Sequence, residues 1–200
     1  MQLNRNGENM AVLAKEDIKA YIDSGKLKIE PFVPENVGPC SIDLTLGNYF
    51  KVYEIDQTPS IDLTIPKLDI PVKEVRRENA QKFTFHPGTL VLGMTAEQVG
   101  IPNDLVGQIT GRSSFARLGL IVEMAPRIDP GFYGNITLEI ANQGPLAVSL
   151  NPGIRFCSLM LEELSRPTIP YRGKYLGIDK PEVTKIALEL RVQKKQKSVS

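Results

Sequence analysis

Apolar and polar positions alternate in short runs from residue 27 onward, and Pro or Gly separates many of these runs. Alternation with a period of two is typical of a half-buried strand, and many short strands joined by tight turns favour a sandwich or barrel over a βαβ array. The predicted strands cover residues 27–29, 42–46, 49–53, 82–85, 89–94, 106–110, 120–124, 135–141, 147–150 and 155–162. The fold class is therefore mainly β.

One amphipathic helix is predicted ahead of the strands, at residues 14–24. Gly25 follows it and can adopt the left-handed conformation that ends many helices. Acidic residues in its first turn suit the helix dipole, although the usual capping side chain is missing. Its apolar stripe comprises Leu13, Ile18, Tyr21 and Ile22.

The predicted domain organisation is a single domain at residues 11–186, because 200 residues fit one core. Residues 1–10 form a loose leader, and residues 187–200 form a basic, polar tail that we expect to be disordered. Residues 54–81 contain three prolines and a charged cluster, which predicts an extended, solvated excursion with one edge strand.

Charge and residue counts narrow the possible functions. The formal net charge of +1 provides no broad basic field, so we expect no nucleic-acid partner. The chain has one histidine, His86 in a turn, and two widely separated cysteines, Cys40 and Cys157, which disfavours a zinc site. No apolar run is long enough to span a membrane, and the N-terminus lacks a signal peptide pattern, so we expect a soluble, cytoplasmic protein with reduced thiols.

Candidate chemistry is concentrated in residues 107–142. A bend at residues 111–117 contains two arginines and two serines, which can hold a polyanion. The turn Asp129-Pro130-Gly131 follows, and then a strand on which Thr137 and Glu139 face away from Ile136, Leu138 and Ile140. Taken singly, these side chains fit a solvated turn and the wet face of a sheet. Together they indicate a candidate phosphate-binding, acid/base site.

The same residues carry a resemblance. GRSSFARLGL at 111–120 and RIDPGFYGNITLEI at 127–140 resemble the signature of the deoxycytidine triphosphate deaminases, the zinc-independent branch of the dUTP diphosphatase superfamily. SIDLTLG at 41–47, LVLGMTAE at 90–97 and GKYLG at 173–177 are similar to further segments of that family, so the resemblance covers about residues 11–186. It implies a dUTPase-like distorted β-barrel or jelly-roll (β-clip) fold and a homotrimer with active sites shared between neighbouring subunits.

The resemblance assigns the catalytic roles. It implies that Glu139 is the general acid/base for deamination at C4 of cytosine, and that Arg117 lies near this chemistry. Ser113 and the main-chain carbonyl of Ala125 would hold the attacking water.

It also assigns the substrate contacts. Arg112, Ser113 and Ser114 would hold the triphosphate, and Asp129 would contact the deoxyribose 3′-hydroxyl. The C-terminal lid, at about residues 170–186, would close over the phosphates. Its contributing residues are Tyr171, Lys174 and Tyr175.

The implied substrates are dCTP and dUTP, with dTTP as a candidate inhibitor and Mg²⁺ carried on the triphosphate. Three activities remain open: deamination of dCTP to dUTP with or without onward hydrolysis to dUMP, dUTP diphosphatase activity alone, and nucleotide binding without catalysis. The chain departs from the family pattern at Pro126, at Ile178, and in a shorter segment between Arg117 and Asp129. The acidic Glu139, at a position that is usually apolar in the diphosphatases, favours the deaminase.

Overall fold

The computed structural model describes residues 11–54, 60–63, 70–78, 81–122 and 125–186. The predicted leader and tail, and part of the excursion at 54–81, lie outside these residues. The observed helical elements are α1 (Lys15–Asp23), the 3₁₀ turn η1 (Pro34–Asn36) and the one-turn helix α2 (Ser113–Ala116).

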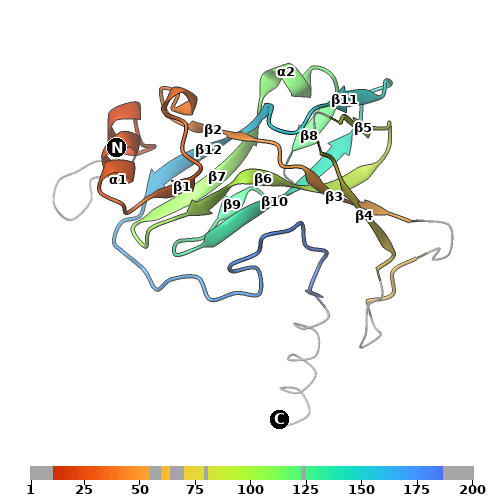
Figure 1. The fold of residues 1–200 in the computed structure, drawn as a ribbon. Helices are drawn as coiled ribbons and strands as arrows, with labels where there is room; N and C mark the ends of the chain where they lie inside the picture. Colours follow the sequence, from red (N-terminus) through yellow and green to blue (C-terminus); the bar gives the residue numbers. More distant parts are fainter. Residues whose placement is uncertain (1–10, 55–59, 64–69, 79–80, 123–124, 187–200) are drawn as a thin grey trace, which may run out of the picture.

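The strands form three sheets (Figure 1). The largest follows the order β4-β3-β6-β10-β8, and β1 also pairs with β6. Its strands are β1 (Lys28–Glu30), β3 (Tyr49–Tyr53), β4 (Val72–Arg76), β6 (Leu90–Gly100), β8 (Leu120–Val122) and β10 (Tyr133–Asn142). A second sheet has the order β2-β12-β7-β9, with β2 (Ile42–Thr45), β7 (Leu105–Gly111), β9 (Arg127–Ile128) and β12 (Arg155–Glu163). The third pairs β5 (Phe83–Phe85) with β11 (Val148–Leu150).

Apolar side chains from all three sheets meet in one core. Aromatic rings run through it: Phe50 stacks on Phe83 with centroids 4.0 Å apart, and Phe156 lies 5.0 Å from Phe115 of α2. Burial of such rings is a large part of the free energy that holds sheets together. The mainly β prediction is confirmed, and the described strands form open sheets rather than one closed barrel.

The predicted helix is confirmed as α1. Ile18 is fully buried, and Gly25 has φ +71°, the left-handed value expected of a helix terminator. The first turn is closed without a capping side chain at Ala14, whose N–H donates to the Asp17 carboxylate at 3.2 Å.

Most predicted strands are present, and β4 is the edge strand expected within 54–81. The main difference is β6, which continues to Gly100 beyond the predicted 89–94. Its later residues include Thr95 and Glu97, which are buried although polar, so the apolar pattern did not mark them. Both polar groups are satisfied: the Glu97 carboxylate accepts the N–H and the hydroxyl of Thr45, and the Thr95 hydroxyl donates to the Glu97 carbonyl.

Residues 164–186, here called the C-terminal strap, run below the large sheet in Figure 1 and are largely irregular. The strap is tied to the turn before β10 and to the start of β10. Tyr171 N–H donates to the Pro130 carbonyl at 2.7 Å, and Gly177 N–H donates to the Tyr133 carbonyl at 2.7 Å. The predicted lid segment is thus docked along the strand that carries Glu139; its motion stays a prediction.

Candidate active site

A pocket of about 520 Å³ lies between the large sheet, the 129–131 turn and the C-terminal strap. Its walls are mostly apolar, with a few polar groups that face inward, which is the usual character of a small-molecule site. Three carboxylates line it: Asp129, Glu139 and Glu182. The aromatic lining residues are Tyr53, Phe132, Tyr171 and Tyr175.

A β-bulge in β6 lies opposite Ile136 of β10, at the pocket wall. Asn135 and Thr137 of β10 pair with Gln98 and Met94, so the three β6 residues at 95–97 lie opposite Ile136 alone. The buried Asn135 amide donates to three carbonyls of β6, and the Ile136 N–H donates to the Thr95 hydroxyl at 3.0 Å. Bulges re-aim side chains near active sites. Next to this bulge, Ile136 lines the pocket together with Thr137 and Glu139, whereas strict alternation predicted that it faces away from them.

Glu139 projects from the middle of this strand and is partly buried. It pairs with Leu92 of β6, which in turn pairs with Lys51 of β3, so these three side chains share one face of the sheet. Tyr53 of β3 reaches the same pocket. Burial raises the pKa of the Tyr53 phenol above its ordinary value, and the negative charge of Glu139 raises it further. A neutral phenol and a carboxylate therefore share this wall.

Asp129 follows β9 and begins the turn that leads into β10. Its carboxylate forms an ion pair with Arg127 at 3.0 Å, and both residues line the pocket. The turn after it requires Gly131, which has φ +78°; a Cβ there would lie 2.5 Å from the Pro170 side chain of the C-terminal strap. Close packing of turn and strap thus fixes the mouth of the pocket next to Asp129.

The C-terminal strap contributes Tyr171 and Tyr175 to the lining. The Tyr175 N–H donates to the Tyr171 hydroxyl at 3.4 Å. Two ammonium groups lie near the centroid of the Tyr175 ring, that of Lys174 at 5.4 Å and that of Lys185 at 5.5 Å. These distances are within the range of cation–π attraction. Lys185 also forms a 3.7 Å ion pair with Glu182. The strap therefore brings cations to the pocket rim.

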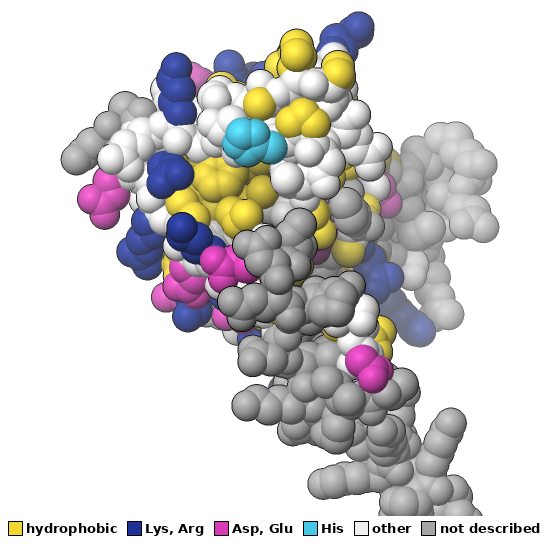
Figure 2. Space-filling model, turned by 90° about the vertical axis from the view of Figure 1, so that its right-hand side faces the viewer, with side chains coloured by type: hydrophobic (Ala, Val, Ile, Leu, Met, Phe, Trp, Pro, Cys, Tyr) yellow, Lys and Arg dark blue, Asp and Glu magenta, His cyan; other side chains and the backbone are white. Residues whose placement is uncertain are grey.

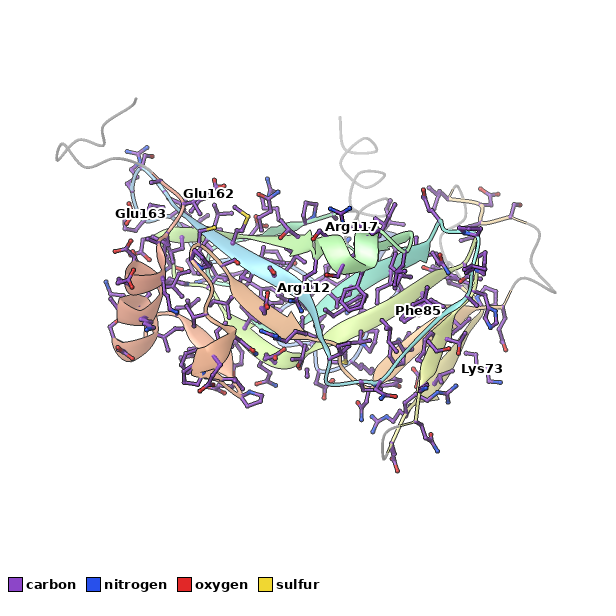
Figure 3. The ribbon with its side chains drawn as sticks, turned by 90° about the horizontal axis from the view of Figure 1, so that it is seen from above. Lys73, Phe85, Arg112, Arg117, Glu162 and Glu163 are labelled. Atoms are coloured by element: carbon purple, nitrogen blue, oxygen red, sulfur yellow. The ribbon has the colours of Figure 1, made fainter. Side chains whose placement is uncertain are left out.

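The GRSS residues lie elsewhere. Gly111 ends β7, Arg112 precedes α2, and Ser113 and Ser114 form the first turn of α2, which Phe115 anchors in the core. Figure 1 places α2 at the top of the molecule, whereas the C-terminal strap lies at the bottom. Seen from above, Arg112 and Arg117 are both found near α2 (Figure 3).

The structure thus divides the predicted site residues into two groups. Ala125, Asp129, Glu139, Tyr171 and Tyr175 line one pocket, with Lys174 next to it. The second group lies outside the lining of that pocket and comprises Arg112, Ser113, Ser114 and Arg117.

Among the titratable side chains that line the pocket, the sequence analysis missed three: Tyr53, Arg127 and Glu182. Arg127 could have been found, because it stands directly before the Ile128-Asp129 motif. Tyr53 and Glu182 reach the pocket only through strand pairing and strap docking, for which the local sequence carries no signal.

Within the described part of the chain, no group of three or more His, Cys, Asp and Glu side chains is arranged to hold a metal ion. No helix among the described residues is long and apolar enough to cross a membrane.

Comparison with known proteins agrees with this architecture. Residues 12–164 match the dCTP deaminase-like family. The chain is 41% identical over 186 residues to a protein of Methanosphaera stadtmanae named dCTP deaminase, dUMP-forming, covering 88% of this chain and 94% of the relative. A Thermobifida fusca protein of the same name is 40% identical over 168 residues, covering 83% of this chain and 85% of the relative.

Among solved structures, the 2′-deoxycytidine 5′-triphosphate deaminase of Agrobacterium tumefaciens superimposes with a TM-score of 0.60 at 21% identity. The superposition covers 77% of this chain and 48% of that one, so this chain spans about half its length. This likeness supports the fold alone.

The mainly β fold, with a carboxylate-lined pocket along β10, agrees with the fold of that deaminase. The chain belongs to the dCTP deaminase-like family, as its motifs predicted. It is therefore an enzyme of the deaminase class.

Proposed function

We propose that this protein deaminates dCTP and hydrolyses the product to dUMP and pyrophosphate in the same site. The observation that carries the proposal is that Glu139 and Asp129, the residues for the two steps, line one pocket. The relatives that cover nearly the full chain are named dUMP-forming, which supports the second step.

In the deamination step, a water attacks C4 of cytosine, and Glu139 takes its proton. Glu139 delivers this proton to N3 and then takes the second proton from the new C4 hydroxyl. It passes that proton to the departing amine, so that the C4–N bond breaks, the C4 carbonyl forms and ammonia leaves. One positioned acid/base group of this kind contributes roughly 10²- to 10⁴-fold in rate. The Ala125 carbonyl is the proposed acceptor that orients the water.

In the hydrolytic step, Asp129 orients a second water toward the α-phosphate while it contacts the deoxyribose. The oxygen of this water bonds to phosphorus, and the bond to the bridging oxygen of pyrophosphate breaks. The nearby Arg127 guanidinium keeps the Asp129 carboxylate in place by its 3.0 Å ion pair. Because that pair is exposed, its contribution to stability is small, and its value lies in orientation.

The residues expected to hold the triphosphate do not line the pocket of their own chain. Arg112, Ser113, Ser114 and Arg117 lie near α2, on the far side of the molecule from the strap (Figure 1). We therefore infer a homotrimer in which the α2 region of one subunit faces the pocket of its neighbour. Lys174 of the strap supplies a further cation at the rim.

Exposed apolar side chains near α2 support such an assembly. Leu118 follows α2, and its carbonyl would lie 2.3 Å from a Cβ on Gly144, so Leu118 and the 143–146 turn are adjacent. Both regions expose large side chains: Leu118 by 52% and Leu146 by 73%. Apolar side chains also gather on the face shown in Figure 2. Apolar surface of this kind is a mark of protein–protein contact.

Mg²⁺ enters the proposal as part of the substrate. The described residues supply no acidic cage, and Mg²⁺ is commonly held by substrate phosphates and water. Bound there, it would neutralise phosphate charge, and the protein residues would hold the phosphates themselves.

The test is to incubate the purified protein with dCTP or dUTP and Mg²⁺ and to measure ammonia, dUTP, dUMP and pyrophosphate together. We expect ammonia, dUMP and pyrophosphate from dCTP, and dUMP from dUTP. The Glu139→Gln variant should lose ammonia release, whereas Glu162→Gln, an exposed Glu on β12, should retain it. Accumulation of dUTP with ammonia would reduce the proposal to a deaminase alone, and pyrophosphate without ammonia would reduce it to a diphosphatase. Added dTTP tests inhibition in the same assay.

A further inference from the structure

Asp43 of β2 lies between two arginines, one of which is Arg112. Its Oδ2 atom is 3.6 Å from a guanidinium nitrogen of Arg112 and 3.5 Å from one of Arg155. Its Oδ1 atom accepts a hydrogen bond from the Ser158 hydroxyl at 2.7 Å. The side chain of Asp43 is only 19% exposed, so these partners dominate its surroundings.

Strand pairing explains why this cluster forms. Ser158 of β12 stands directly opposite Asp43 of β2, and Thr110 of β7 stands opposite Ser158 on the other side. In the second sheet, Asp43 and Ser158 are therefore adjacent, and both lie close to the end of β7, after which Arg112 follows. Arg155 begins β12 and completes the set.

The Arg112 guanidinium is held at two points. One terminal nitrogen donates to the Arg155 carbonyl at 2.9 Å, and the other faces Asp43. Because the guanidinium is planar and rigid, two contacts on different nitrogens fix its orientation. They engage only part of its five N–H donors, so donors remain for an anion.

The two oxygens of Asp43 contact different groups. The hydrogen bond from Ser158 to Oδ1 joins β2 to β12, and a purely structural aspartate would need only this contact. Oδ2 faces both guanidiniums and offsets the repulsion between two like charges that share one site. Since both oxygens are engaged by protein groups, the effect of Asp43 on the substrate would pass through the arginines that it holds.

We propose that Asp43 is a positioning residue that orients Arg112 for the phosphate chain of the nucleotide, with Arg155 and Ser158 holding Asp43 in place. This inference rests on the proposed function, in which Arg112 binds phosphate. An arginine that is already oriented loses less side-chain freedom when the anion binds, so the effect belongs to binding and not to the chemical step.

The experiment compares Asp43→Asn, Arg112→Ala and the double variant, with Asp104→Asn as the control. Asp104 is also a partly buried aspartate with a hydrogen-bonded partner, Tyr21, but it lies away from α2. The readouts are KM and kcat for dCTP, the inhibition constant of inorganic tripolyphosphate, and thermal unfolding.

Asp43→Asn keeps an acceptor for Ser158 but places an amide against the guanidiniums. We expect it to raise KM and the tripolyphosphate inhibition constant by about tenfold while kcat stays nearly constant, as for loss of one charge-assisted contact. In the Arg112→Ala background it should add almost nothing, because Asp43 acts through Arg112. Asp43→Glu, which restores the charge, should recover part of the affinity.

Equal effects of Asp43→Asn in both backgrounds, an unchanged KM, or loss of the fold in both Asp43 variants would each overturn the inference. If Arg112→Ala itself left tripolyphosphate binding unchanged, the phosphate role of Arg112 in the proposed function would fail instead. The two failures are therefore distinguishable.

Discussion

Tyr53 and Glu139 belong to strands that flank β6 on opposite sides, yet both line the same pocket. The charge of Glu139 contributes to raising the pKa of the Tyr53 phenol, after the larger effect of burial. The phenol therefore stays neutral throughout the pH range in which a carboxylate can shuttle protons. It can serve as a dipole beside Glu139 but not as a second base.

This relationship can be measured directly. Removal of the carboxylate charge in Glu139→Gln should lower the pKa of Tyr53 while leaving it above the ordinary value, because burial remains. Tyrosinate absorbance is followed during alkaline titration of the wild type, Glu139→Gln and Tyr53→Phe, the last of which identifies the signal. Glu162→Gln is the charge-matched control. An identical Tyr53 titration in wild type and Glu139→Gln would show that the two groups do not interact.

The separation of α2 from the pocket predicts complementation between inactive variants. Arg112→Ala and Glu139→Gln should each be nearly inactive alone, since each substitution removes a required side chain from every active site of the trimer. In trimers from co-expression of both, random pairing restores about a quarter of the sites if each site is built from two neighbouring chains. The assay is ammonia release from dCTP, with each variant expressed alone as the control. No recovery in verified mixed trimers would mean that a single chain supplies both residues to its own site.

The docking of the C-terminal strap depends on Gly134. Its φ is +147°, and a Cβ there would lie 3.0 Å from the Ile178 carbonyl oxygen, so Gly134→Ala should push the strap away from β10. We expect faster tryptic cleavage at Lys174 and Lys185 and a higher KM. Gly25→Ala is the matched control, since Gly25 also has a positive φ but a Cβ there would meet no atom within 4 Å. Equal protease sensitivity of the two variants would contradict the role of Gly134 in strap docking.

Each agreement and each difference between the predicted and the observed strands has a physical reason. The short strands were predictable because each presents one face to the core, and their side chains alternate accordingly. The end of β6 was not, because Thr95 and Glu97 are buried and satisfied by hydrogen bonds to distant partners. Hydrophobic patterning carries no information on such partners.

The site shows the same limit. Arg112 and Glu139 belong to one short stretch of sequence, which suggested one cluster, but β7 and β10 enter different sheets. Conversely, Tyr53 is distant from Glu139 in sequence and adjacent to it in the pocket, because both strands pair with β6. Residue type predicted the chemistry of each group, whereas only the pairing of strands determines which groups meet.

Tyr21 of α1 supports a prediction about stability at high pH. Its pKa is raised to about 12, first by burial and then by Asp104, whose carboxylate accepts a hydrogen bond from the phenol at 3.2 Å. The negative charges of Glu163 and Asp17 raise the pKa further. The Lys26 ammonium lies 5.6 Å from the ring centroid. Because the folded protein keeps this proton when the unfolded chain has lost it, the contribution of Tyr21 to stability is fully present below pH ~10 and is lost as the pH rises through the folded pKa. Tyr21→Phe should thus be less stable than the wild type at pH 8, by about 1 kcal/mol for one hydrogen bond. The difference in the free energy of unfolding should shrink toward pH 12.

Urea unfolding at pH 8 and near pH 12 measures this difference, with Tyr133→Phe as the control for loss of an exposed hydroxyl. A difference that stays constant with pH would show that Tyr21 does not titrate as the structure implies.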